Sequence, residues 1–346
     1  MTNAGELPAE VRFLLDPAVY PHPVAEVELV QTHISYVLLA GDFVYKMKKP
    51  VDFGFLDFTE LDRRRYYCAE ELRLNRRLCP EIYLAVVSLN RAAAGGLALE
   101  GSEDGPGEPV EYLVKMARLP QEGMMPRIID RGELTPEHLH LIVHKLVPFY
   151  RRADDSPEVR ELGGVAAVRF NVEENFQQTV DFVGTPALSR ERFARIREGS
   201  LAFLDRPELF AARQEAGRVR EGHGDLHAAN ICFAGDQVHI FDCIEFNRRF
   251  RCADVAEDIA FLAMDLDFRD LGELSRHFVE YYAHLANDPE VLTMLPFYCC
   301  YRAYVRGKIN LFTAAEPEVD DTTRQQAQQQ AARYFALAQC YADELC

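Results

Sequence analysis

The stretch that decides the fold runs from Gly222 to Asp258 and reads GHGDLHAANICFAGDQVHIFDCIEFNRRFRCADVAED. It begins with a polar segment that contains Asp225 and Asn230. Two short strand-like runs follow, separated by a Gly-Asp turn, and Asp242 stands directly after the second run. Because a hairpin brings its two ends together, Asn230 and Asp242 are predicted to converge, with Asp225 on the loop beside them.

Oxygen ligands at one point suit a hard divalent cation. Mg²⁺ takes one or two protein oxygens and shares its other positions with phosphates and water, which fits Asn230 and Asp242 as its ligands. A second carboxylate without metal, Asp225, is what phosphoryl transfer to a hydroxyl needs, to orient the hydroxyl and accept its proton. The competing interpretation is a polar loop without chemistry, and His223 is expected to be a buried, hydrogen-bonded histidine.

The run H-G-D-L-H-x-x-N, followed by a strand, a turn and I-F-D, resembles the catalytic and metal-binding loops of the aminoglycoside phosphotransferase family. That family is similar in fold to the protein kinases, whose corresponding run is H-R-D-L-x-x-x-N. The resemblance implies Asp225 as the catalytic base, Asn230 and Asp242 as the Mg²⁺ ligands, and ATP as the phosphoryl donor.

The same resemblance implies an α+β, bilobal protein-kinase-like fold. Its small antiparallel-sheet N-lobe, with the nucleotide-binding sheet and helix, is expected in residues 1–119. The large helical C-lobe, with the catalytic and metal-binding loops, is expected in residues 120–346, and the site is expected between the lobes. The pattern of the chain agrees with this order: strand-like and hairpin signals dominate before Pro120, and helical periodicity dominates after it.

The N-terminal half supplies a candidate for the phosphate-anchoring lysine. Strands are predicted at 34–40 and 43–47 around a Gly41-Asp42 turn, and a helix over 59–78 that Thr59 would cap. Lys46 ends the run F-V-Y-K on the second strand, and Glu71 lies on the apolar face of the helix, as a kinase-like fold requires. Lys48 shares the strand face of Lys46 and remains a rival.

The rest of a nucleotide site has weaker signals. No G-x-G-x-x-G run precedes Lys46. The turn over residues 31–35, ending at Ser35, would offer hydroxyls and backbone N–H groups in place of glycines. Residues 111–116, ending at Met116 and followed by Pro120, resemble the strand and hinge that bind adenine through the backbone.

Further runs extend the resemblance over most of the chain. The family implies that one aspartate of the pair Asp254 and Asp258 ties down the catalytic loop through backbone hydrogen bonds. V-Y-K-x-K-K-P-V-D-F-G-F-L-D, L-N-R-R-L and D-C-I-E-F-N resemble an uncharacterised bacterial branch whose members sometimes carry an additional P-loop kinase domain. The motif G-x-x-x-x-G-K-[ST] does not occur in this sequence, so no such domain is expected in it.

Composition narrows the partners and the compartment. The 346 residues include 38 Lys and Arg against 55 Asp and Glu, a formal charge of −17, which argues against nucleic acid and anionic membranes as partners. Nine scattered cysteines without a C-x-x-C pair are not a disulfide framework. The first twenty residues have no secretory pattern, and a cytoplasmic protein is therefore expected.

The acceptor is left open by the sequence. One basic cluster covers residues 247–251 and another comprises Arg302, Arg306 and Lys308. Each cluster would suit either an anionic acceptor or ordinary salt bridges. We predict a small-molecule kinase that transfers the ATP γ-phosphoryl group to a hydroxyl of an unidentified acceptor. The alternatives are a catalytically inactive kinase-like nucleotide-binding protein and a metal-dependent hydrolase built on His223, Asp225 and His227.

Overall fold

The computed structural model of the chain describes residues 7–92, 95–317 and 319–345. Cys346 and the first six residues of the segment considered for a secretory signal lie outside this part. By its contacts the chain forms two compact units, Met1–Arg127 with Cys232–Asn247, and Ile128–Ile231 with Arg248–Cys346. The hairpin segment 232–247 thus groups with the N-terminal unit, whereas the sequence analysis assigned it to the C-lobe. The functional boundary between residues 119 and 120 stays a prediction.

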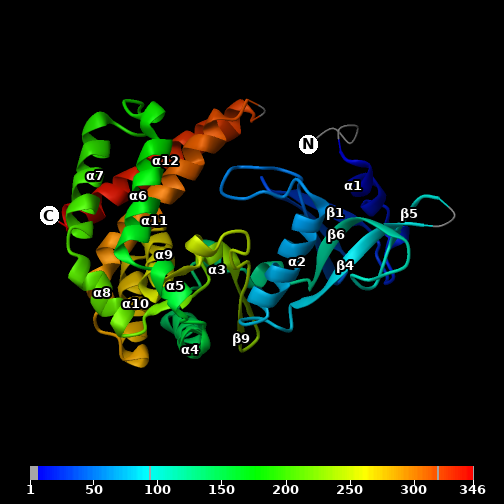
Figure 1. Cartoon of the computed structure of the whole chain (residues 1–346), viewed down its shortest axis with the longest axis horizontal. Coiled ribbons are helices and arrows are strands. Elements are labelled where there is room, and N and C mark those ends of the chain that lie inside the picture. The colour runs from blue at the N-terminus through cyan, green and yellow to red at the C-terminus, as the bar shows by residue number, and fades with distance from the viewer. Residues whose placement is uncertain (1–6, 93–94, 318, 346) are drawn as a thin grey trace. The chain divides into compact units, whose positions relative to one another are not determined.

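The first unit is built on an antiparallel sheet of six strands, shown at one end of Figure 1. Its spatial order is β1-β2-β3-β6-β4-β5. The strands are β1 (Val27–Gln31), β2 (Ser35–Ala40), β3 (Phe43–Lys48), β4 (Tyr83–Arg91), β5 (Leu97–Leu99) and β6 (Glu108–Ala117). The predicted hairpin is confirmed: β2 and β3 pair through a tight turn in which Gly41 has φ +59°, a left-handed conformation that glycine adopts at little cost.

The two faces of the sheet have different partners because side chains alternate along a strand. Tyr45 and Met47 of β3 pack in an apolar cluster with α1 (Ala9–Leu14). Lys46 and Lys48 lie on the opposite face, where both make ion pairs with the next helix, α2 (Leu61–Asn75).

The predicted start of α2 was wrong by two residues. The N-cap is Glu60, not Thr59. The hydroxyl of Thr59 instead donates to the Asp57 carboxylate at 2.6 Å, because Asp57 forms a local turn that also accepts the Thr59 N–H group. Local side-chain bonding has therefore taken Thr59 away from the helix.

The first unit also contains, from Cys232 onward, the hairpin of β8 (Ile231–Ala234) and β9 (Gln237–Ile240). The backbone of Cys232 forms an isolated antiparallel β-bridge with Met124, and its thiol donates to the Pro120 carbonyl at 3.5 Å. Gly123 lies so close to β8 that a Cβ atom at this position would be 1.9 Å from the Phe233 carbonyl oxygen. The hairpin is thus packed directly against the segment that follows β6.

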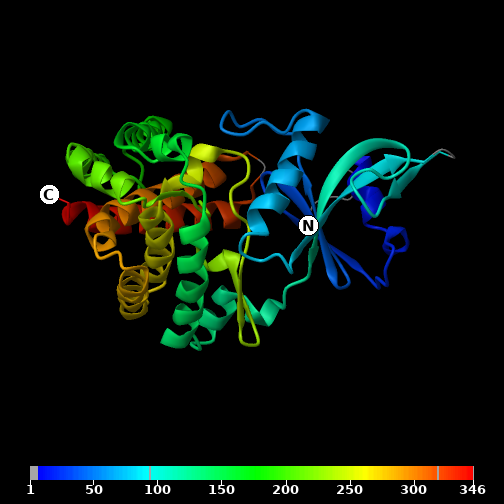
Figure 2. The same ribbon diagram turned by 60° about the horizontal axis from the view of Figure 1, so that its bottom comes forward.

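The second unit is helical, and Figures 1 and 2 show its helices gathered around α9. Almost every side chain of α9 is buried. The helical periodicity predicted after Pro120 is confirmed, because most of the elements of this unit are helices. The elements are α3 (Met125–Asp130), which begins in the first unit, α4 (Pro136–Arg152), α5 (Pro157–Leu162), α6 (Val165–Gln178), α7 (Arg190–Leu204), α8 (Pro207–Glu215), β7 (Val219–Glu221), β10 (Cys252–Asp254), α9 (Val255–Phe268), α10 (Gly272–Ala286), α11 (Val291–Ala315) and α12 (Asp321–Asp343).

None of the helices in the described residues has the length and apolar character required to span a bilayer.

A buried arginine holds the start of α9. Arg213 of α8 contacts both oxygens of Asp254 at 2.7 Å and also pairs with Asp288, and all three side chains are buried. Asp254 in turn caps α9 by accepting the Ala256 N–H group.

Arg213→Met should lower the free energy of unfolding by about 3–5 kcal/mol, because two buried carboxylates lose their guanidinium partner. Urea unfolding followed by circular dichroism measures this loss. Arg160→Met, which removes an exposed pair with Asp155, is the matched control and should lower it by less than about 1 kcal/mol. Equal losses in the two variants would contradict the assignment.

Candidate active site

The predicted catalytic loop lies in the second unit and is tied down from α9. The Asp258 carboxylate accepts the His223 N–H group at 2.7 Å through one oxygen and the Gly224 N–H group at 2.8 Å through the other. Of the two aspartates considered, Asp258 therefore anchors the loop, whereas Asp254 caps the helix. His223 is completely buried, and its Nδ1 accepts the Asp225 N–H group at 3.2 Å, in agreement with a structural role.

Gly224 is required by the path of this loop. Its φ is +84°, and a Cβ atom there would lie 2.7 Å from the Phe250 carbonyl oxygen. Side chains other than glycine are strained at such a φ and would also collide with the backbone. The loop therefore reaches Asp225 in a conformation that the H-G-D sequence makes possible.

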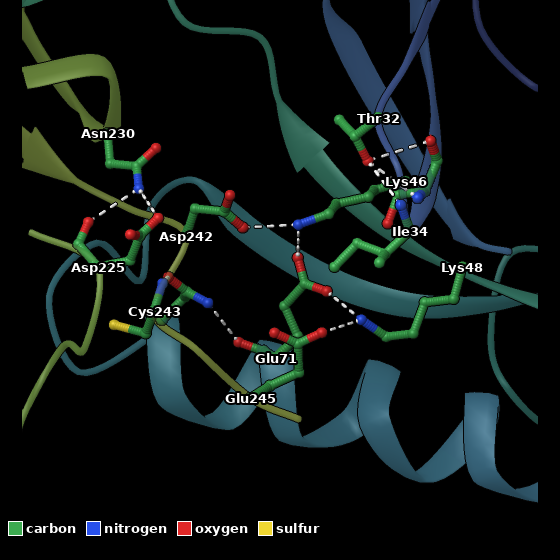
Figure 3. A network of polar contacts seen from close by, with 12 residues as sticks. Thr32, Ile34, Lys46, Lys48, Glu71, Asp225, Asn230, Asp242, Cys243 and Glu245 are labelled. Carbon is green, nitrogen blue, oxygen red and sulfur yellow. Dashed lines mark hydrogen bonds and ion pairs between the residues drawn. The ribbon is translucent and has the colours of Figure 1, made fainter. Parts of the chain in front are cut away.

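Asp225 and Asn230 contact each other directly, as Figure 3 shows. The Asn230 amide nitrogen donates to the Asp225 backbone carbonyl and to its carboxylate, both at 3.0 Å. Burial would raise the pKa of Asp225, but His227, 3.3 Å away, and Arg306 hold that pKa well below its ordinary value. Asp225 is thus an ionised carboxylate, and the two bonds of Asn230 use its amide nitrogen rather than the oxygen that a cation would bind.

In the first unit, Lys46 joins the predicted glutamate to the predicted metal ligand. Its ammonium group is 2.9 Å from Glu71 Oε1 and 2.6 Å from Asp242 Oδ1. The Lys46 side chain is 12% exposed and that of Asp242 is 42% exposed, so a ligand can reach the Asp242 carboxylate. The structure therefore brings Lys46, Glu71 and Asp242 together (Figure 3).

Lys48 does not compete with Lys46 for Glu71, because the glutamate contacts both lysines. The Lys48 ammonium group lies 2.7 Å from Glu71 Oε2 and also pairs with Glu245. Burial would raise the pKa of Glu71, but the two ammonium groups lower it. Burial also raises the pKa of Glu245, and the facing Lys48 opposes that rise.

The segment that carries Asp242 has an unusual backbone. Asp242 has φ +65°, which a residue other than glycine rarely adopts. Two side chains hold the turn: the Asp242 N–H group donates to the Tyr83 hydroxyl at 3.1 Å, and the Cys243 N–H group donates to the Asn75 side-chain oxygen at 2.9 Å. The neighbouring structure therefore determines this strained position, as is common at functional sites.

Ser35 and Met116 lie outside the contact group of Lys46, Glu71 and Asp242. Ser35 is opposite Lys48 in the sheet and is fully buried, and within the described residues its hydroxyl has no hydrogen-bond partner. Met116 is opposite Val44 and packs with the apolar cluster beneath α2. Their roles in nucleotide binding stay predictions.

The turn that replaces a glycine-rich loop is not as open as expected. The Thr32 hydroxyl accepts the N–H groups of Ile34 and Ser35 at 3.3 and 2.9 Å. A serine or threonine side chain that closes its own turn uses the donors that a phosphate would need. Two of the N–H groups in this turn are therefore used within the turn itself, and the role of the turn in nucleotide binding stays a prediction.

Several side chains of the two basic clusters have partners inside the second unit. Arg249 pairs with Glu174 at 2.7 Å, Arg251 with Glu221 at 3.1 Å, and Arg302 with Glu257 at 2.7 Å. Lys308 donates to the side-chain oxygens of Asn175 and Gln178. The three ion pairs agree with the salt-bridge interpretation for Arg249, Arg251 and Arg302, whereas the two partners of Lys308 are uncharged amides.

Sequence reasoning missed the side chains that support the site. Asn75, Tyr83 and Glu245 hold the segment of Asp242, and Asp265 accepts the Ala228 N–H group of the catalytic loop at 2.9 Å. A single sequence carries no spacing signal for such partners. The one available clue is Glu245, three residues after Asp242 in a basic stretch.

No known family model matches the chain. Uncharacterized proteins from Mycobacterium tuberculosis and Mycobacterium bovis are each 31% identical to it over 303 residues, which cover 86% of this chain. The chain spans 58% of the length of these curated relatives.

Solved structures show the fold. A choline kinase from Cryptosporidium parvum has a TM-score of 0.54 at 11% identity, with 97% of both chains covered. An amicoumacin kinase in complex with AMP-PNP, Ca²⁺ and Ami has a TM-score of 0.52 at 11% identity, with 94% of this chain and 93% of that chain covered. The GDP complex of aminoglycoside 2'-phosphotransferase-IIIa has a TM-score of 0.50 at 13% identity, with 95% and 99% covered. The chain therefore has the α+β, protein-kinase-like fold of small-molecule phosphotransferases, as its motifs predicted.

Asp258→Asn should loosen the catalytic loop, because an amide cannot accept both N–H groups. We expect hydrogen exchange at His223 and Gly224 to accelerate by about tenfold or more, measured by mass spectrometry of peptides that cover the loop. Asp267→Asn is the control, since Asp267 lies on the same helix and accepts from Tyr341 instead. Unchanged exchange in Asp258→Asn would show that the loop is held by other contacts.

Proposed function

We propose that the protein is a small-molecule kinase that transfers the γ-phosphoryl group of ATP, with Mg²⁺, to a hydroxyl group of its acceptor. The observation that carries the proposal is the contact group of Lys46, Glu71 and Asp242 in one unit. An ammonium group held by a glutamate, next to an accessible carboxylate, is what binding of a metal–nucleotide complex needs. The fold shared with choline and amicoumacin kinases supports the same reaction class.

Each residue then has a defined task. Lys46 neutralises the nucleotide phosphates, and Glu71 keeps its ammonium group in place. Asp242 and Asn230 would hold Mg²⁺ through their side-chain oxygens, and the ion would supply positive charge that neutralises the phosphates. Asp225, ionised and close to His227, orients the acceptor hydroxyl and takes its proton as the new P–O bond forms and the bond from the γ-phosphorus to the leaving ADP breaks.

The donor groups fit a magnesium–nucleotide complex better than a tightly bound transition metal. Among the described residues, no three His, Cys, Asp or Glu side chains are grouped to hold a metal ion. His223 and His227 use their Nδ1 atoms to accept backbone N–H groups of their own loop. The contacts of the loop therefore do not support a metal-dependent hydrolase.

A screen for phosphoryl transfer tests the proposal directly. The purified protein is incubated with Mg²⁺, ATP or GTP, and a panel of alcohols that contains aminoglycosides, amino alcohols and sugars. We expect nucleoside diphosphate and phosphorylated acceptor to form in equal amounts. Binding of the nucleotide without transfer to any acceptor and without slow hydrolysis would instead favour the inactive, nucleotide-binding alternative.

Asp225→Asn should keep nucleotide binding within about twofold and lower turnover by about 10²–10⁴-fold, because the general base is lost while the amide preserves its shape. Lys46→Met should instead weaken nucleotide binding itself, since it removes the charge that faces the phosphates. Calorimetric titration with ADP and the rate of ADP formation separate the two effects. Wild-type turnover in Asp225→Asn would remove the central assignment.

A further inference from the structure

The five-residue segment from Asp242 to Phe246 is held in place by side chains from other parts of the first unit, near both of its ends. Tyr83 and Asn75 bind the backbone at Asp242 and Cys243. At the other end, the side chain of Glu245 is buried and pairs with Lys48. We call this the metal segment, because it carries the proposed metal ligand Asp242.

Lys48 is a lysine without access to solvent. Its side chain is 0% exposed, and its ammonium group contacts Glu71 at 2.7 Å, contacts Glu245, and lies 5.0 Å from the centre of the Phe58 ring. An ammonium group is buried only where opposite charges compensate for its lost hydration. Two carboxylates from different segments, α2 and the metal segment, provide that compensation.

The charges of this group are unequal. The two ammonium groups of Lys46 and Lys48 face three carboxylates, those of Glu71, Glu245 and Asp242. Glu71 and Glu245 are buried, whereas the Asp242 side chain is 42% exposed, so Asp242 is the carboxylate of the three that solvent reaches. A cation is attracted to such a position, and it can reach Asp242 without disturbing the buried part.

The two lysines therefore have separate tasks. Lys46 is partly exposed and can exchange its contact with Asp242 for a phosphate. Lys48 cannot reach a ligand without leaving both of its buried partners. While Lys46 binds phosphate, Lys48 remains the cation that neutralises Glu71 and keeps the metal segment on α2 (Figure 3).

We propose that Lys48 and Glu245 are a positioning pair for metal binding, which fixes the metal segment against Glu71 so that the Asp242 carboxylate is presented to the cation of a metal–nucleotide complex. The inference rests on the proposed function and extends it by assigning the second lysine. Neither residue touches the nucleotide or the reacting atoms. Their contribution appears in how strongly Mg²⁺ enhances nucleotide binding.

Calorimetric titration with ADP, once in EDTA and once in excess Mg²⁺, gives this enhancement as the ratio of two Kd values. In Glu245→Gln and in Lys48→Met we expect the ratio to fall by about tenfold or more, as for other residues that orient a metal ligand. Binding of metal-free ADP should change by less than about threefold in both variants. In the variant that combines Glu245→Gln with Lys48→Met, the ratio should fall no further than in either single variant, because all three variants break the same ion pair.

Arg64→Met is the matched control. Arg64 also lies on α2 and is also buried, and it pairs with Glu111 at 2.9 Å without contacting the metal segment. It should lower the melting temperature as Lys48→Met does and leave the Mg²⁺ enhancement unchanged. If Lys48→Met does not fold, Lys48→Met combined with Glu245→Met removes both charges together and keeps the volume.

Three results would overturn the inference. They are an unchanged Mg²⁺ enhancement in Glu245→Gln, a full enhancement in the double methionine variant, and a loss of metal-free ADP binding in Lys48→Met that equals the loss in Lys46→Met. The last would make Lys48 the phosphate ligand. A wild-type protein that binds no ADP in either buffer would refute the proposed function and the inference together, and that result is distinct from the other three.

Discussion

The Glu71 carboxylate contacts two lysines of the same strand, and the rest of the first unit's candidate site depends on this interaction. Each oxygen of Glu71 pairs with one ammonium group, at 2.9 Å for Lys46 and 2.7 Å for Lys48. Two ion pairs therefore join the helix α2 to the strand β3. Both lysines also form ion pairs with the segment after β9, Lys46 with Asp242 and Lys48 with Glu245. Charges that cannot be hydrated must be paired, and this requirement connects three pieces of chain that lie far apart in the sequence.

Much of the fold could be predicted because its signals are local. The Gly41-Asp42 turn between two alternating runs predicted β2 and β3, and helical periodicity predicted that the chain after Pro120 is mostly helical. Local competition explains the failure at Thr59, whose hydroxyl bonds to Asp57 rather than to the first turn of α2. The same kind of local bonding occurs in the turn at Thr32, whose hydroxyl accepts the N–H groups of Ile34 and Ser35.

The candidate site was predictable where spacing carries information. The period of a strand places Lys46 and Lys48 on one face, and the period of a helix turns Glu71 toward them, so these contacts follow from the sequence. The prediction treated the two lysines as alternatives, because strand alternation shows which face a side chain lies on but not how many lysines Glu71 contacts. Tyr83, Asn75 and Glu245 could not be predicted, since their contacts with the metal segment join positions separated by about 160 to 200 residues through packing alone.

The path of the chain has a consequence for dividing the protein into parts. The first unit is made of two separate stretches, Met1–Arg127 and Cys232–Asn247, and the chain passes through the second unit between them. A fragment that stops after residue 127 would keep Lys46 and Glu71 but lose Asp242 and Glu245, leaving Lys48 buried with only half of its counter-charge. The sheet unit is therefore not an autonomous module that could be cut out or exchanged at a single junction. Only a circular permutation or a linker that replaces residues 128–231 would preserve its charge balance.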